Sequence, residues 1–204
     1  MNNLSKLLIT ALAFGGSIST ASAAGDVTDV TASGAGLGSF DKGVIGAART
    51  LDFTKTFDSL NPITLSFTVA HGTGPGNPYT VTENITNNTN QAWTDFHFTI
   101  NEPATGGQGD VFTSHEQATL TGFTLDSSSG PRNLDFTGSL AAHSSTTATF
   151  NLNLNPFDPG ANNGANNVTL TQVPSVPEPE TYAMLLAGLG VMGAIARRRN
   201  KSNA

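Results

Sequence analysis

The sequence predicts an all-β protein, an antiparallel β-sandwich of immunoglobulin-like or jelly-roll-like type flanked by a helix at each end of the chain. Three observations predict this fold class. Apolar and polar residues alternate with a period of two in several short segments, turn clusters rich in Gly and Pro separate these segments, and the middle of the chain lacks helical periodicity. Closure of the same strands into a barrel is the alternative.

The first element, over residues 1–23, has the features of a secretory signal peptide. Lys6 supplies a positive charge and an apolar run follows it. Ala21 and Ala23 give the small-x-small pattern that signal peptidase accepts, so we expect cleavage after Ala23, with Ala24 as the alternative. The apolar run is too short to span a bilayer comfortably, so this segment predicts export rather than anchoring.

The predicted sandwich domain occupies residues 24–172. Alternation is clearest over residues 63–69, 96–100 and 150–154, where an apolar side chain recurs at every second position, as in a half-buried strand. Weaker strand candidates are residues 27–31, 49–57, 79–85, 118–125, 134–140 and 168–173.

The stretch between Tyr79 and Ile100 predicts a β-hairpin. Residues 79–85 would run in one direction and residues 92–100 would return beside them. The connection, residues 87–90, is rich in asparagine, which tolerates the left-handed backbone conformation that tight turns use.

Charge and composition limit the classes of function. Charged residues make up only 12% of the 204 residues, and the formal net charge is −6. This argues against nucleic acid as a partner, because neutralising phosphates needs clustered Lys and Arg. The chain has no cysteine, so disulfides, thiolate metal sites and cysteine nucleophiles are excluded. An exported domain of this kind must be stabilised by its core.

Catalytic motifs are lacking in the middle of the chain. No two histidines have a zinc-binding spacing, and no serine lies in a Gly-x-Ser-x-Gly motif. We therefore expect no catalytic residues, no cofactor and no enzyme. Two carboxylates brought together by folding would instead make a polysaccharide hydrolase, which is the alternative function.

Two weaker binding sites are also suggested. Asp158 lies in an Asn-rich loop whose oxygens could contribute to a calcium site, although a solvated loop is the favoured interpretation. Trp93 and Tyr79 are candidates for stacking on sugar rings. Strict alternation places Trp93 on the face opposite Phe96 and Phe98, so it would be exposed if those two point inward. A core position is nevertheless the favoured interpretation for a lone tryptophan.

The last element is a tail over residues 173–204. Its parts are a motif at Pro177, Glu178 and Pro179, an apolar transmembrane helix at 181–196, and a basic end at 197–201 that includes Arg197, Arg198 and Arg199. The helix covers only about 22 Å of a hydrocarbon core roughly 30 Å thick, so it is a marginal span. The arginines would remain on the cytoplasmic side, leaving the preceding chain outside.

This tail resembles the PEP-CTERM sorting tail of Gram-negative bacteria that make extracellular polysaccharide. The Pro-Glu-Pro motif, the apolar helix and the arginine cluster occur in the family's order and at its usual distance from the C-terminus. The resemblance implies recognition by an exosortase, a membrane-embedded processing enzyme that would cut near the Pro-Glu-Pro motif and release the body. A simple one-pass membrane anchor is the alternative.

These features predict an exported, non-enzymatic protein of the cell surface or extracellular matrix. The resemblance further implies a role in biofilm or floc material, with exopolysaccharide as a partner. Signal peptidase and exosortase are the partners expected during export, with only transient contact with the inner membrane. The alternatives are a secreted polysaccharide-acting hydrolase and a plainly membrane-anchored surface domain.

Overall fold

The computed structural model describes residues 24–46, 48–101, 110–176 and 184–192. Most of these residues lie in β-strands, with two 3-10 turns, η1 (His115–Gln117) and η2 (Asn155–Phe157), between strands. The prediction of an all-β domain is therefore confirmed for the described residues between 24 and 176, and the described part of the chain as a whole is mostly β.

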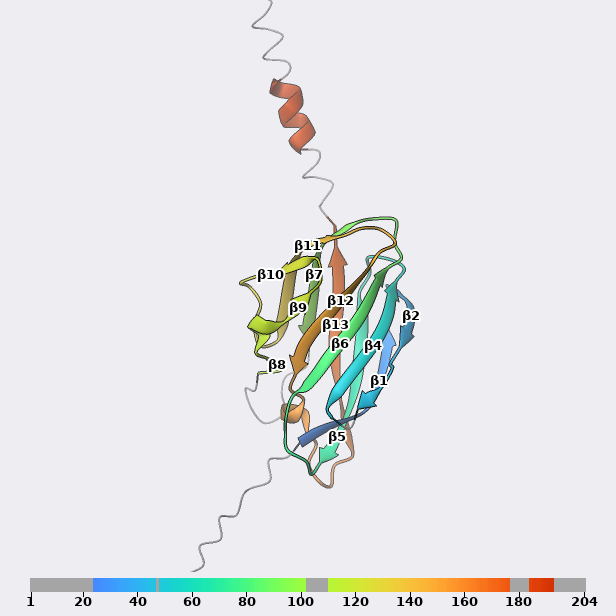
Figure 1. Ribbon diagram of the computed structural model, residues 1–204, viewed down its shortest axis with the longest axis vertical. Helices are drawn as coiled ribbons and strands as arrows, with labels where there is room; N and C mark the ends of the chain where they lie inside the picture. The colour runs from blue at the N-terminus through green and yellow to red at the C-terminus, as the bar shows by residue number, and fades with distance from the viewer. Residues whose placement is uncertain (1–23, 47, 102–109, 177–183, 193–204) are drawn as a thin grey trace, which may run out of the picture.

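The strands form two sheets (Figure 1). The six-stranded sheet has the order β1 (Ala24–Ser33), β5 (Ile63–Gly72), β13 (Ala165–Ser175), β7 (Trp93–Ile100), β11 (Asn133–Leu140) and β10 (Phe123–Leu125). The seven-stranded sheet has the order β2 (Leu37–Asp41), β4 (Thr50–Phe57), β6 (Tyr79–Asn87), β12 (Ser145–Leu152) and β8 (Phe112–Thr113), with β3 (Ile45–Gly46) on β4 and β9 (Thr119–Leu120) on β12.

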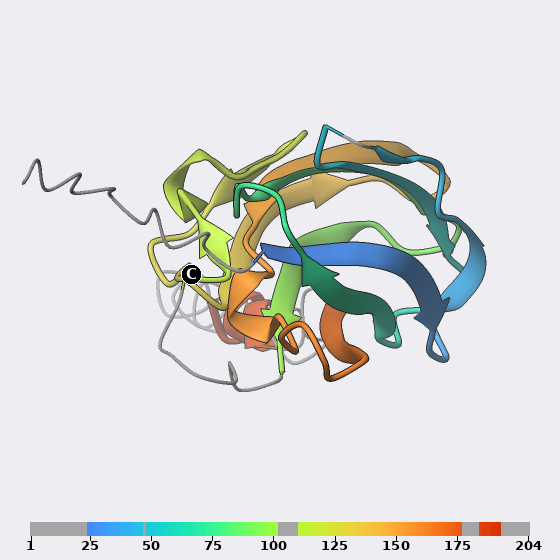
Figure 2. The same ribbon diagram turned by 90° about the horizontal axis from the view of Figure 1, so that it is seen from below.

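The two sheets face each other across one apolar core, as the view in Figure 2 shows. Alternation along the central strands places every second side chain in this core, and β5 buries Ile63, Leu65, Phe67 and Val69 completely. Aromatic rings meet across the layers, and the centroids of Phe98 on β7 and Phe150 on β12 are 5.3 Å apart. This two-layer packing is the arrangement of a β-sandwich.

The prediction of purely antiparallel pairing is wrong at one place. Strands β4 and β6 pair in parallel, from Thr50 opposite Thr80 to Phe57 opposite Asn87. The intervening strand β5 belongs to the other sheet. Because the chain reverses direction at each crossing between layers, β6 returns in the same direction as β4.

The predicted hairpin is also wrong. Strand β6 lies in the seven-stranded sheet and β7 in the six-stranded sheet, so the Asn-rich connection is an arch between the layers. Asn87, the last residue of β6, is fully buried there, and its side chain bonds to the backbone of the connection. Its Nδ2 donates to the carbonyls of Gln91 (2.8 Å) and Ala141 (3.1 Å), and its Oδ1 accepts from the Thr89 N–H (2.9 Å).

The tail contributes a short helix over residues 184–192. Its large apolar side chains are exposed, from 59% for Leu189 to 75% for Met184. Within the described ranges, no helix has both the length and the apolar character needed to cross a bilayer. The transmembrane helix expected over 181–196 is thus not confirmed, and the signal helix expected over 1–23 lies outside the described residues.

Candidate functional site

The sequence-predicted sugar contact at Trp93 is wrong, because the residue is fully buried. Alternation in β7 is interrupted: Trp93 and Phe96 both point into the core although three positions separate them. The pairing of β7 with β11 shifts register at this point, between Thr137 and Leu140. Trp93 packs edge-on against Phe57 of the opposite sheet, with ring centroids 5.3 Å apart.

Tyr79, the second predicted sugar contact, is only 4% exposed, so an open stacking platform is wrong here as well. Its hydroxyl accepts a hydrogen bond from the Val27 backbone N–H at 2.9 Å, which ties the start of β6 to β1 in the other sheet. The Arg49 guanidinium lies over its ring, 4.3 Å from the centroid. The ring is therefore covered by this chain's own side chains.

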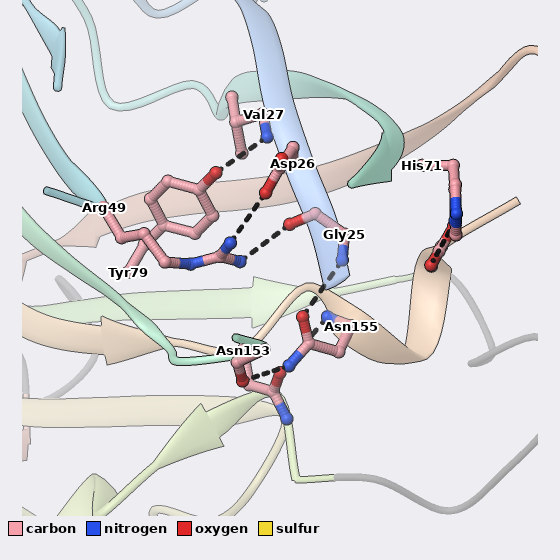
Figure 3. A network of polar contacts seen from close by, with 10 residues as sticks. Gly25, Asp26, Val27, Arg49, His71, Tyr79, Asn153 and Asn155 are labelled. Atoms are coloured by element: carbon pink, nitrogen blue, oxygen red, sulfur yellow. Dashed lines mark hydrogen bonds and ion pairs between the residues drawn. The ribbon is translucent and has the colours of Figure 1, made fainter. Parts of the chain in front are cut away.

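Arg49 contacts residues at the starts of β1 and β6 (Figure 3). It precedes β4 with a positive φ of 57°, a conformation that non-glycine residues rarely adopt. Its two terminal nitrogens donate to Asp26 Oδ1 (2.7 Å) and to the Gly25 carbonyl (2.8 Å). Arg49 Nε is buried and has no hydrogen-bond partner among the described residues. The contacts explain why the strained backbone is retained.

Asn155, in the η2 turn, also holds the first residues of β1 by a hydrogen bond. Its Oδ1 accepts from the Gly25 N–H at 3.0 Å, and its Nδ2 donates to the Gly76 carbonyl (Figure 3). Asn153 Oδ1 in turn accepts from the Asn155 N–H at 3.1 Å. The first residues of β1 are thus held by side chains from the seven-stranded sheet and its approach, Tyr79 and Arg49, and by Asn155 of the η2 turn.

An open hollow of about 560 Å³ lies beside this network. Its lining includes the guanidinium of Arg49 and the exposed residues Pro75, Asn77 and Pro78. Asp26 also borders it, with 44% of its side chain exposed. The lining combines apolar proline rings with hydrogen-bonding groups.

The calcium interpretation of Asp158 is not supported by its surroundings. Both of its carboxylate oxygens lie 3.0 Å from His71 Nδ1, and the Gly160 N–H donates to Oδ1 at 2.8 Å. Across the parts of the chain that the structure describes, no group of three or more His, Cys, Asp or Glu residues could hold a metal ion. Asp158 instead fixes the loop that follows η2 against β5.

A second hollow, of about 400 Å³, bears on the hydrolase alternative. Its lining includes two carboxylates, Glu116 from η1 and Asp126 from the turn after β10, together with His115 and Ser129. Asp126 also accepts a hydrogen bond from the Thr137 hydroxyl at 2.8 Å. The sequence showed His115 and Glu116 only as adjacent residues, and folding adds Asp126 to them.

Nearby on β11, Asp135 belongs to a polar cluster on the outer face of the six-stranded sheet. Its Oδ1 lies 2.8 Å from His97 Nδ1, and its Oδ2 accepts from Asn133 (2.6 Å) and Ser128 (3.2 Å). Burial opposes ionisation, but the hydrogen bonds outweigh it, so the pKa of Asp135 lies below its usual value.

Sequence reasoning missed three polar residues in the core: Lys55, Glu83 and Gln172, each fully buried. Lys55 is ion-paired with Glu83, and Gln172 Nε2 donates to Glu83 Oε1 at 3.0 Å. The signal was present, because Lys55 falls in the alternating inward series with Phe53 and Phe57. A charged residue at an inward position predicts a buried partner.

The folded domain and the tail meet at a definite point. Strand β13 continues to Ser175, beyond the boundary expected at residue 172. Ala24, the alternative signal-cleavage position, is the buried first residue of β1. The remaining cleavage and sorting residues, namely Ala21, Ala23, Pro177, Glu178, Pro179, Arg197, Arg198 and Arg199, lie outside the described residues.

The described β domain ends with β13, at Ser175, and the tail follows it. The tail itself, over residues 175–200, matches the family model of the PEP-CTERM protein-sorting motif. The chain thus carries a PEP-CTERM sorting motif, as its sequence predicted, and this motif indicates export through exosortase-dependent sorting. No curated protein and no solved structure matches the chain.

Proposed function

We propose that the protein is a non-enzymatic component of the cell surface or extracellular matrix, released there after its tail is removed. The observation that carries this proposal is the position of the sorting motif, which begins at Ser175, the last residue of β13. Cleavage near Pro177 would therefore separate the tail without removing a strand from the folded domain.

The intact mass of the protein from the producer's extracellular fraction tests this proposal. We expect a species that starts at Ala24 and ends near the Pro177-Glu178-Pro179 motif. A matched variant with all three motif residues changed to alanine should accumulate in the membrane fraction with its tail retained. Recovery of the wild-type protein only from membranes, with the tail intact, would contradict release and would favour the plain anchored surface domain.

The proposed ligand is exopolysaccharide, held at the hollow beside Arg49. Asn77 offers an amide to sugar hydroxyls, and the rings of Pro75 and Pro78 offer apolar surface to the faces of a sugar. Tyr79 does not stack on the sugar in this proposal; its ring packs against the Arg49 guanidinium instead.

Co-sedimentation of the mature protein with the producer's exopolysaccharide tests this contact. The Asn77→Ala variant should bind more weakly than the wild type, whereas Asn163→Ala, at an exposed residue that does not line the hollow, should bind equally well. Equal binding by all three proteins would show that the hollow is not the contact.

The hydrolase alternative is favoured by one observation, the pair of carboxylates that borders the second hollow. If it were correct, incubation with exopolysaccharide would shorten the polymer, and Glu116→Gln would abolish the shortening. We expect instead that the polymer keeps its length distribution, which size-exclusion chromatography with light scattering measures directly.

A further inference from the structure

The buried polar group at the centre of the core carries an inference that does not depend on the proposed function. Lys55 on β4 and Glu83 on β6 come from neighbouring strands of the seven-stranded sheet, and Gln172 comes from β13 in the opposite sheet. All three side chains are fully buried. The group therefore bridges the two layers in a region without access to solvent.

The carboxyl group of Glu83 holds two nitrogen atoms at once. Its Oε2 accepts a hydrogen bond from Lys55 Nζ, and its Oε1 accepts one from Gln172 Nε2 at 3.0 Å. Gln172 Oε1, although buried, has no hydrogen-bond partner among the described residues. Gln172 is therefore held on Glu83 through its amide nitrogen alone, and its carbonyl group makes no hydrogen bond with a described residue that would have to break before an attack on Cδ.

The surroundings favour a nucleophilic lysine. Burial lowers the pKa of Lys55, and the nearby Glu83 opposes this effect without cancelling it. A lowered pKa increases the fraction of uncharged amine, the form with a lone pair available for attack. A dry site also protects an amide product from hydrolysis.

We propose that Lys55 and Gln172 react to form an intramolecular amide bond, with Glu83 transferring the protons. In the uncharged form of Lys55, with Glu83 as carboxylate, the Nζ lone pair attacks the side-chain carbonyl carbon of Gln172 and forms the new C–N bond and a tetrahedral intermediate. The carboxyl group takes the proton that the attacking nitrogen loses at Oε2 and delivers a proton to the departing nitrogen at Oε1. The bond from Cδ to Nε2 breaks, ammonia leaves, and Glu83 ends in its starting state.

Such a bond would link β4 to β13, and hence the two sheets, in a chain that has no cysteine. A link between residues so distant in the sequence restricts the unfolded chain, which is the main way in which a disulfide stabilises a protein. The bond would thus supply the covalent staple that an exported protein without disulfides otherwise lacks.

The intact mass of the purified full-length or mature protein decides whether the bond forms. Loss of one ammonia lowers the mass by about 17 Da relative to the sequence mass. Trypsin does not cleave after an acylated lysine, so the digest should contain a branched peptide that joins the segments around Lys55 and Gln172. This mapping is needed because succinimide formation at Asn163-Gly164 also releases ammonia.

Matched variants separate the possible results. Lys55→Met keeps the length of the side chain but removes the amine, so it should show the full sequence mass. Lys42→Met, at an exposed lysine paired with Asp29, should retain the loss and the branched peptide. Glu83→Gln should fold without forming the bond. If this variant fails to fold, the tryptic peptides of the wild type and the masses of the two lysine variants still show whether the amide bond forms.

Two results would overturn the proposal. The full sequence mass in the wild type, with free peptides around both residues, would show that the group is an ordinary buried ion pair. A loss of about 18 Da, one water, with a branch between Lys55 and Glu83, would show that the carboxyl group is the acceptor rather than the proton carrier.

Discussion

At the scale of single residues, polar side chains in this protein mostly hold its strands together. Tyr79 joins the start of β6 to β1 through its hydroxyl, and Arg49 joins β1 to the turn before β4. Asp158 fixes the loop after η2 to His71 on β5. Residues that resemble ligand contacts in the sequence therefore have partners within the fold.

Replacement of Trp93 by alanine measures whether the indole belongs to the core. Because its ring is fully buried against Phe57 and Phe96, we expect the free energy of unfolding to fall by about 3–5 kcal/mol. Urea denaturation followed by circular dichroism measures this change. Val44→Ala, at a residue that is 64% exposed, should change the value by less than about 0.5 kcal/mol. Equally small effects of both substitutions would place Trp93 at the surface.

Asp135 should make stability depend on pH in the acidic range. Its pKa in the folded protein lies below its value in the unfolded chain, so ionisation stabilises the fold. This contribution is fully present above the unfolded value, about 3.9, and is lost as the pH falls through the lowered folded value. Asp135→Asn should therefore reduce the difference in Tm between pH 7 and pH 3.

The matched control for this substitution is Asp52→Asn, on the exposed face of β4. Its profile of Tm against pH should follow that of the wild type. A wild-type profile in the Asp135 variant would show that the hydrogen bonds to His97, Asn133 and Ser128 do not stabilise the carboxylate.

At the scale of the elements, the connection between β6 and β7 has the largest influence on the topology. The Asn87 side chain bonds to three backbone groups, and these bonds hold the arch that carries the chain from one sheet to the other. Position 87 is buried, so water cannot easily replace the bonds.

Asn87→Ala should lower the free energy of unfolding by about 2–4 kcal/mol, because it leaves the buried Thr89 N–H and two partly buried carbonyls without this partner. Asn90→Ala, in the same connection, should have an effect below about 0.5 kcal/mol, since Asn90 is exposed and makes only a side-chain contact with His143. Urea denaturation measures both changes in the free energy of unfolding. Equal values for Asn87→Ala and Asn90→Ala would show that the arch does not depend on the buried asparagine.

At the scale of the whole molecule, the folded domain and the sorting tail are separate in structure. The core is complete at β13, and the apolar side chains of the helix over 184–192 remain exposed. Their exposure is consistent with a tail that serves sorting rather than folding.

Removal of residues 177–204 should leave the free energy of unfolding within about 0.5 kcal/mol of the full-length value and should increase solubility. A longer truncation that ends the chain at Thr169 should not fold, because it removes half of a strand that lies between β5 and β7. Similar destabilisation by both truncations would show that the tail packs on the domain.

Much of the fold class could be predicted because alternation along a strand is a local property. The series over residues 63–69 became β5, and the series over 150–154 overlaps the end of β12. Pairing between strands could not be predicted, since it depends on contacts between distant segments. The Asn-rich connection suits a hairpin turn and an arch equally well, and only the partners of Asn87 decide between them.

The candidate sites divide in the same way. A sorting motif is read from a linear order of residues, so the sequence by itself determined the tail at 175–200 and the export that it indicates. Burial depends on what the opposite sheet places over a side chain, so only the tertiary structure decided that Trp93 and Tyr79 are covered. Only the tertiary structure, too, brought Lys55 and Gln172 from two other strands to the carboxyl group of Glu83.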